Sequence, residues 1–190
     1  MRLLLIILFF SFTSVAADWP QVGAFAPEIK LKDTDGKMFV LGEQKNKTVL
    51  VFYRGSWCPY CIRQLKSIKE DLVKKAKQKN VKLVAISVDK LLVAKKMKKK
   101  FGFDFTIISD PKAESLKAYK IVNKLSDELV RKYKNSYQID VENDSGQIHH
   151  MVAHPAVFIV ENKKVIFSDV HTDYKQRTDN KEILKALGID

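Results

Sequence analysis

The sequence predicts an α/β fold, with helices on both faces of a mixed central sheet. Short apolar runs typical of buried strands alternate with longer runs of helical period, and the chain closes with a hairpin and a final helix. Its 190 residues are enough for one globular domain with a sizeable core. No long linker, internal repeat or low-complexity stretch interrupts the sequence after residue 17.

The first 17 residues have the pattern of a secretory signal peptide. Arg2 supplies a positive start, residues 3–10 form an apolar core, and residues 11–17 are mostly small. The apolar core is shorter than the roughly 20 residues of a membrane span. We therefore expect cleavage after Ala17 and a single mature domain at residues 18–190, in a periplasmic or secreted protein. An uncleaved membrane anchor is the alternative.

The first half of the mature chain predicts a leading hairpin, a buried strand and a long helix. Residues 25–40 alternate weakly around the turn signal at residues 33–36 and predict an N-terminal β-hairpin extension. Residues 48–53 are β-branched and apolar, which is typical of a buried central strand. Residues 59–79 carry apolar side chains three or four apart and predict one helix that ends at Asn80.

The middle of the chain continues the alternation. A second buried strand is expected at residues 81–88, a helix at 91–101, a short strand at 105–108 and a short helix at 113–119. Residues 121–152 form an ambiguous insertion. We expect in it a helix near residues 126–133, followed by a polar loop through residues 143–146.

The end of the chain predicts two strands and a helix. Strands are expected at residues 155–160 and 165–168, joined by a turn at 161–164. Asp179 and Glu182 resemble a capping box that opens a helix at residues 181–187, and Gly188 is suited to close it.

The two cysteines, Cys58 and Cys61, are the main candidate for chemistry. They lie three residues apart, so a disulfide between them closes almost no loop and would stabilise the fold little. Pro59 suits the first position of a helix, which puts Cys58 at the N-cap and Cys61 in the first turn. The helix dipole there favours a thiolate, the form of cysteine that attacks.

The neighbouring residues fit a redox centre. The second cysteine is close enough to attack a mixed disulfide or a sulfenic acid on the first, so we expect a redox-active Cys58–Cys61 disulfide. Trp57 and Tyr60 would shield the sulfurs from water, and Arg54 would add positive charge.

Two other readings of the cysteine pair are weaker. A purely structural disulfide is disfavoured by the short spacing. Half of a zinc site would need histidines, but the four in the chain lie about 90 or more residues away without the paired spacing of a zinc site. These are His149, His150, His154 and His171. We expect no metal and no bound cofactor.

The chain is basic, with a formal net charge of +12. Such a charge can indicate nucleic acid or an anionic membrane surface. The lysines instead repeat at helical spacing opposite apolar residues, which is the pattern of a solvated helix face. Stacking aromatics are not interleaved with them, as a single-strand binder would require. We expect no nucleic-acid partner and no stable membrane anchor after signal cleavage.

Four segments resemble the peroxiredoxin-like AhpC/TSA family of the thioredoxin superfamily. Residues 52–61 (FYRGSWCPYC) resemble its active-site segment, and residues 84–89 and 103–111 resemble the strand and the Ser-Asp-Pro segment that follow. Residues 154–160 resemble the strand that faces the active site. The resemblance runs from about residue 23 to residue 187 and implies a thioredoxin-like fold.

The resemblance implies two chemistries and leaves them open. In the peroxidase pattern Cys61 is peroxidatic and Cys58 replaces a hydroxyl residue. Arg54 then stands where a proline is common, and Pro155 where an arginine is usual. In the thioredoxin pattern Cys58 attacks and Cys61 resolves, and Trp57 favours this pattern. The resemblance also implies a cis bond before Pro155, packed against the dithiol, with an ordinary trans proline as the alternative.

The function expected first is a peroxiredoxin-like antioxidant enzyme that reduces peroxides through a Cys58/Cys61 dithiol–disulfide cycle. The alternative is a thioredoxin-like protein thiol–disulfide oxidoreductase with Cys58 as nucleophile. Either would take electrons from a dithiol reductant such as a thioredoxin-like protein. A non-enzymatic binding module is a third reading, but it would not need paired cysteines at a helix start.

Overall fold

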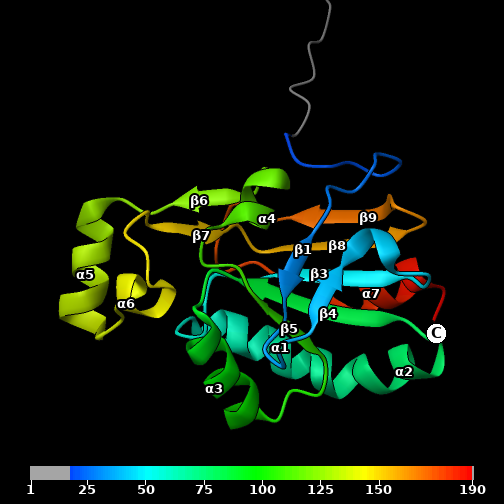
Figure 1. Ribbon diagram of the computed structural model, residues 1–190, viewed down its shortest axis with the longest axis horizontal. Coiled ribbons are helices and arrows are strands. Elements are labelled where there is room, and N and C mark those ends of the chain that lie inside the picture. The colour runs from blue at the N-terminus through cyan, green and yellow to red at the C-terminus, as the bar shows by residue number, and fades with distance from the viewer. Residues whose placement is uncertain (1–17, 190) are drawn as a thin grey trace, which may run out of the picture.

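A five-stranded mixed sheet forms the centre of the computed structural model, which describes residues 18–189 (Figure 1). The signal peptide predicted at residues 1–17 lies outside the described residues. The strand order is β5-β4-β3-β8-β9, with β3, β4 and β5 parallel and β8 and β9 antiparallel to their neighbours. The strands are β3 (Thr48–Phe52), β4 (Lys82–Ser87), β5 (Thr106–Ser109), β8 (Ala156–Glu161) and β9 (Lys164–Val170).

Strand β3 lies in the middle of the sheet. Every one of its side chains is apolar or β-branched, and all five are buried. Val51 pairs with Ala85 of β4 on one side and with Val157 of β8 on the other. Such an unbroken apolar run is typical of a strand covered on both faces. The strand ends directly before the loop that carries the cysteines.

Helices cover both faces of the sheet, as predicted. One face packs against α1 (Pro59–Asp71), α2 (Val73–Gln78), α3 (Leu91–Phe101) and α7 (Asn180–Leu187), and α1 to α3 lie together beneath the sheet in Figure 1. The other face packs against α4 (Glu114–Ala118) and the N-terminal hairpin.

The predicted N-terminal hairpin is confirmed. It consists of β1 (Lys30–Lys32) and β2 (Met38–Val40), followed by a 3₁₀ turn, η1 (Leu41–Glu43). The hairpin adds Phe39 to the core on the face where Phe52, Tyr119 and Phe158 pack.

The single helix predicted at residues 59–79 is wrong in one respect, because it divides at Leu72. Leu72 and its neighbour Val73 are both buried in the same core. Adjacent positions of a regular helix point about 100° apart, so the break lets both side chains reach the sheet.

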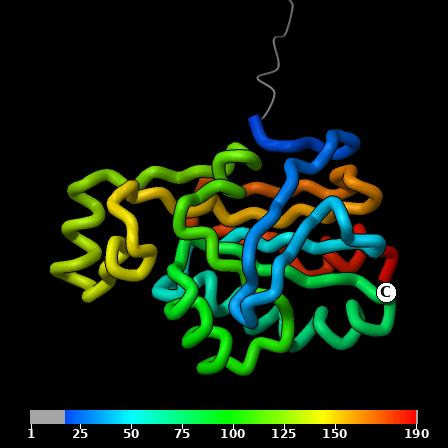
Figure 2. The backbone as a smooth tube through the Cα atoms, in the orientation of Figure 1, coloured from blue at the N-terminus to red at the C-terminus, as the bar shows by residue number. Residues whose placement is uncertain are grey.

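The insertion at residues 121–152 contains more structure than predicted. Its short strands β6 (Val122–Lys124) and β7 (Met151–Ala153) pair in an antiparallel sheet of their own. Between them lie α5 (Asp127–Tyr137) and α6 (Val141–Ser145), which project at one end of the molecule (Figure 2). The polar loop predicted at residues 143–146 is therefore largely helical.

Local hydrogen bonds explain the two helices of the insertion. The Ser126 side chain caps α5 by accepting from Leu129 N, and the Asp140 side chain caps α6 by accepting from Asn143 N. Gly146 ends α6 in the left-handed region, at φ 69°.

The cis bond expected before Pro155 is wrong. No cis peptide bond occurs between residues 18 and 189, so Pro155 is trans. The chain passes here directly from β7 to β8 and keeps an extended path. His154 N donates to Ile121 O at 2.8 Å, and Pro155 O accepts from His171 N at 2.9 Å. The residues on either side of this trans bond are thus tied to the residue before β6 and to the segment that follows β9.

Candidate active site

The dithiol lies at the carboxyl end of the central strand, as predicted. Phe52 ends β3, and Pro59 opens α1 with Cys58 as its N-cap residue. Both cysteines are free thiols, and their side chains are almost fully buried, with Cys58 1% exposed and Cys61 0% exposed. The centre is therefore a reduced pair enclosed by protein.

The two sulfurs have opposite acidities. Hydrogen bonding from the Cys61 thiol lowers the pKa of Cys58 to about 6, outweighing burial, with help from the Cys61 backbone N–H and the charges of Arg54 and Arg177. Burial raises the pKa of Cys61, and the neighbouring Cys58 raises it further. Near neutral pH, Cys58 is the thiolate and Cys61 its protonated partner.

Arg54 contributes charge and a backbone donor. Its backbone N–H donates to Cys61 Sγ at 3.4 Å. Its side chain is only 2% exposed and lies among aromatic rings: the guanidinium carbon is 4.9 Å from the Trp57 ring and 4.8 Å from the Tyr174 ring. One Nη also donates to the Tyr133 hydroxyl at 3.0 Å. Aromatic faces, not a carboxylate, hold this buried cation.

Trp57 and Tyr60 pack against the core that contains both cysteines, and each also contacts another aromatic ring. The Trp57 ring lies 5.5 Å from that of Tyr133, and the Tyr60 ring lies 5.9 Å from that of Tyr174, measured between centroids. Both side chains are only partly buried. The insertion therefore reaches the active site through Tyr133.

Arg177 is the main site residue that sequence reasoning missed. It lies in residues 171–178, here called the strap, which joins β9 to α7. Its Nη2 donates to Cys61 Sγ at 3.2 Å and approaches Cys58 Sγ at 3.8 Å. Its Nη1 donates to the carbonyls of Tyr174 and Gln176 at 2.6 and 2.5 Å. No local motif marks this arginine.

Asp89 is a second site residue whose role was missed, although the resemblance included its segment. It follows β4 and is 1% exposed. Its Oδ2 accepts from Ser56 N at 2.9 Å and from the Ser87 hydroxyl at 2.9 Å. Burial raises the pKa of Asp89 to about 7. The carboxyl group fixes the loop that leads into Cys58.

Three of the four histidines considered for a zinc site have partners away from the cysteines. His149 Nε2 lies 2.7 Å from the carbonyl oxygen of Pro111, His150 contacts Asp127 and Glu142, and His171 contacts Asp169. Within residues 18–189, no cluster of three or more His, Cys, Asp or Glu side chains could hold a metal ion.

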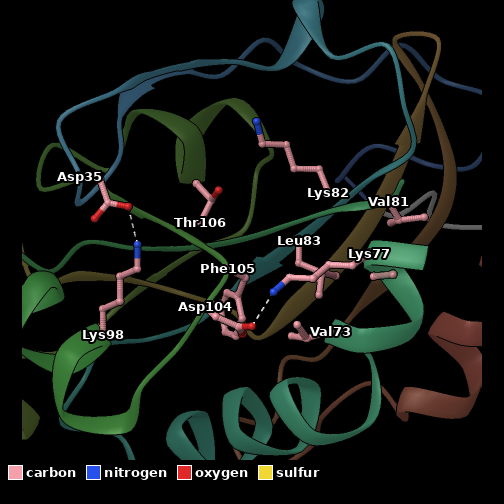
Figure 3. Close-up of a pocket in the computed structure, with 11 residues that line it drawn as sticks. Asp35, Val73, Lys77, Val81, Lys82, Leu83, Lys98, Asp104, Phe105 and Thr106 are labelled. Atoms are coloured by element: carbon pink, nitrogen blue, oxygen red, sulfur yellow. Dashed lines mark hydrogen bonds and ion pairs between the residues drawn. The ribbon is translucent and has the colours of Figure 1, made fainter. Parts of the chain in front are cut away.

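A separate pocket lies away from the dithiol and offers no comparable chemistry. Figure 3 shows its two ion pairs, Lys98–Asp35 and Lys77–Asp104, each 2.6 Å long. Its volume is about 310 Å³, and its lining holds neither cysteine nor histidine. These charges neutralise one another across the pocket.

Comparison with known proteins identifies the family of the sequence. Residues 22–168 match the model of the AhpC/TSA family. The thiol–disulfide oxidoreductase ResA of Bacillus thuringiensis subsp. konkukian (strain 97-27) is 29% identical over 103 residues, which cover 54% of this chain and 59% of that protein. ResA of Bacillus subtilis (strain 168) is 30% identical over 100 residues, which cover 52% and 55%. The chain thus spans less than two thirds of these relatives.

Solved structures show the same fold. Peroxidoxin BcpB from Mycobacterium tuberculosis superposes with a TM-score of 0.67 at 17% identity, covering 89% of this chain and 95% of that one. A peroxiredoxin-like protein from Aquifex aeolicus superposes with a TM-score of 0.70 at 16% identity, covering 90% and 88%. The fold is thioredoxin-like with a leading hairpin, and the family model matches most of the sequence. The chain belongs to the AhpC/TSA family of the thioredoxin superfamily.

Proposed function

We propose that the protein is a thiol–disulfide oxidoreductase in which Cys58 is the nucleophile and Cys61 the resolving thiol. The observation that carries this proposal is the asymmetry of the pair. Cys58 is the N-cap residue of α1 and its pKa is lowered to about 6, whereas Cys61 is fully buried and its pKa is raised. The names of the ResA relatives describe the same class of reaction.

The reaction follows from these roles. The Cys58 thiolate attacks one sulfur of a substrate disulfide, and the S–S bond breaks with release of the first substrate thiolate. Cys61 then loses its proton and attacks Cys58 Sγ in the mixed disulfide. The Cys58–Cys61 disulfide forms, and the second substrate thiol leaves. The substrate gains two electrons and the enzyme loses them, so an external dithiol must reduce the pair again.

Arg177 and Arg54 would act at both steps. Arg177 reaches both sulfurs, so its charge can stabilise whichever one is the thiolate. Arg54 supplies a fixed positive charge together with a backbone donor to Cys61. Neither residue needs to move a proton.

Peroxide reduction by the same pair is a second candidate function. Near-complete burial of Cys58 between two arginines suits a small electrophile, and the fold is that of peroxiredoxins. The Cys58 thiolate would attack one peroxide oxygen, the O–O bond would break, and water or an alcohol would leave. Cys61 would then displace hydroxide from the sulfenic acid, which leaves as water. The raised pKa of Cys61 weighs against Cys61 as the peroxidatic residue.

One experiment separates these candidates. Residues 18–190 would be assayed with excess dithiol for reduction of a protein disulfide and for consumption of hydrogen peroxide, alongside Cys58→Ser and Cys61→Ser. We expect disulfide reduction to disappear in Cys58→Ser, and Cys61→Ser to accumulate a mixed disulfide at Cys58. Fast peroxide consumption that survives in Cys58→Ser and is lost in Cys61→Ser would contradict the proposed roles.

Export and a reductant complete the proposal. The sequence of residues 1–17 supports export to the periplasm or outside the cell. A thioredoxin-like dithiol protein is the electron donor that this proposal requires, because the oxidised pair must be reduced by an external dithiol. Within residues 18–189, no helix is long and apolar enough to cross a membrane. Mass spectrometry of the exported protein should find Asp18 as its first residue. A mature form that retains residues 1–17 would refute cleavage after Ala17.

A further inference from the structure

A long groove opens beside the dithiol and plays no part in the chemistry described so far. It has a volume of about 830 Å³ and runs between α1 on one side and the strap and the first turns of α7 on the other. Tyr60 and Arg177 line it, and Arg177 also contacts both sulfurs. Neither cysteine lines the groove, but Arg177 connects its wall to both sulfurs.

The groove has the length of a short peptide. Its α1 wall extends from Tyr60 past Gln64, Ser67 and Asp71 to Lys75 of α2. Fifteen residues of helix rise about 22 Å, at 1.5 Å per residue. An extended chain advances about 3.3 Å per residue, so about six residues would fit. A hydrogen peroxide molecule would occupy only a small fraction of this volume.

The lining carries polar groups without partners. Gln64 Oε1, Thr178 Oγ1 and Arg177 Nε have no hydrogen-bond partner among the described residues, although Gln64 is only 7% exposed and Thr178 only 5% exposed. Unsatisfied polar atoms in such places are unfavourable. A peptide backbone offers both N–H donors and carbonyl acceptors, and so could satisfy all three.

The end of the groove nearest the dithiol is positively charged. The Arg63 guanidinium lies 5.7 Å from the Tyr60 ring, and the Lys175 ammonium lies 5.8 Å from the Tyr174 ring. These two rings contact each other, so both cations lie beside one aromatic pair, and Arg177 Nη1 donates to the carbonyl of Tyr174.

Three carboxylates line the groove, and two of them are already engaged, while the third, Glu70, lies about two helical turns from Arg63. Asp71 accepts hydrogen bonds from Ser67 and Asn180, and Asp179 caps α7. The cations by the sulfurs are therefore available to a ligand with negative charge.

We propose that this groove binds an extended peptide segment on one side of the substrate disulfide, with acidic residues next to the reacting cysteine. The inference rests on the proposed thiol–disulfide activity and adds its substrate class. The peptide backbone would meet Gln64 and Thr178, and its acidic side chains would meet Arg63 and Lys175.

The test compares four disulfides as substrates of the reduced enzyme. Two are ten-residue peptide disulfides that differ only in Asp or Lys residues flanking the cysteine, and two are small, glutathione disulfide and hydroxyethyl disulfide. We expect kcat/KM for the acidic peptide to exceed that for the basic peptide about tenfold at low salt. It should also exceed kcat/KM for glutathione disulfide, which is acidic but too short to fill the groove.

Charge-reversal variants locate the effect. Arg63→Glu with Lys175→Glu should reduce the preference for the acidic peptide to below twofold. The matched control is Lys124→Glu with Lys132→Glu, the same charge change in a pocket on the other side of Tyr174. The control should keep the tenfold preference. All four side chains are exposed, so a charge reversal there is not expected to unfold the protein. Turnover of hydroxyethyl disulfide reports whether each variant is folded and active.

The outcomes are distinct. Reduction of hydroxyethyl disulfide without preference between the peptides overturns the groove proposal alone, as does equal loss of preference in both double variants. Preference for glutathione disulfide over the acidic peptide also overturns it, because a long occupant is then wrong. Reduction of none of the four disulfides overturns the proposed activity, and the groove proposal with it.

Discussion

The two arginines beside the dithiol come from different kinds of structure. Arg54 follows the central strand and is buried among aromatic rings, without its guanidinium touching a sulfur. Arg177 lies in the strap near the end of the chain, and its guanidinium contacts both sulfurs. Both lower the pKa of Cys58. One acts through space from the core, and the other acts by contact from a surface segment.

Near each arginine, a carboxylate anchors the backbone of the same segment. Asp89 accepts from Ser56 N and fixes the loop between Arg54 and Cys58. Asp179 accepts from Lys181 N at 2.9 Å and fixes the start of α7, two residues after Arg177. The first anchor is buried and the second is exposed. The comparison teaches that one half of the site belongs to the folded core, whereas the other half can be perturbed without unfolding it.

The largest difference between the two halves should appear in stability. Arg54→Ala removes a packed side chain and leaves a void among the aromatic rings, so we expect the free energy of unfolding to fall by about 3 kcal/mol. Arg177→Ala should cost less than about 1 kcal/mol. Urea unfolding monitored by tryptophan fluorescence measures both values. Equal losses would mean that the strap belongs to the core as fully as the loop does.

The buried anchor should make stability depend on pH. The pKa of Asp89 rises from 3.8 to about 7 on folding, because burial disfavours its charged form. Between these values the folded state holds a proton that the unfolded state has lost, so stability falls as pH rises from about 4 to 7. We expect Asp89→Asn to reduce this fall by about 2 kcal/mol.

Other titrating groups also contribute to the pH dependence of stability, and comparing wild type with Asp89→Asn removes their shared contribution. Asp110 and Asp144 also have raised pKa values, again mainly because of burial, and add a slope of the same sign to both proteins, whereas the lowered pKa values of Cys58 and His154 add a slope of the opposite sign. Only the difference between wild type and variant belongs to Asp89. Parallel curves of unfolding free energy between pH 4 and 7 would show that Asp89 does not titrate there.

Arg177 should matter more for reactivity than for stability. Arg177→Ala removes a cation from the sulfurs and should raise the pKa of Cys58 by about one unit, which cuts the thiolate fraction at pH 6 about fivefold. The midpoint of the alkylation rate against pH reports this pKa independently of access to the sulfur. Arg177→Lys should restore most of the shift. Arg131→Ala, on exposed α5, is the matched control and should leave the midpoint in place.

The smallest effect is expected at Asp179, the exposed anchor. Asp179→Ala removes a helix cap and should cost about 1 kcal/mol of stability. Ser126→Ala removes the cap of α5 and should cost a similar amount. Only Asp179→Ala should also speed alkylation of Cys58, because it loosens the end of the strap. If both variants speed alkylation equally, the strap does not control access to Cys58.

The central part of the fold could be predicted from the sequence because its signals are local. The strand at residues 48–52 is continuously apolar, and the helix at residues 91–101 has clear periodicity. The strands β6 and β7 gave no such signal. Each has three residues, and β6 is Val-Asn-Lys, so their structure depends on pairing across about 30 residues of chain.

The site divides in the same way. Cys58, Cys61 and Arg54 lie within one short segment, where a helix start and a preceding strand make their positions predictable. Arg177 reaches Cys61 from 116 residues away, and its strap has neither helix nor strand periodicity. Its role depends on how β9 and α7 pack, which no single-sequence pattern encodes. The same limit applies to the wrong cis expectation at Pro155, because the hydrogen bonds beside this residue involve Ile121 and His171, which are distant in the sequence.

The position of the strap also has a consequence for biosynthesis. A ribosome completes Cys58 and Cys61 long before it reaches Arg177, which lies 116 residues beyond the second cysteine. Until the strap docks, the nascent dithiol lacks the cation that touches its sulfurs. The centre therefore matures last, and full thiolate reactivity marks a chain whose C-terminal segment has docked.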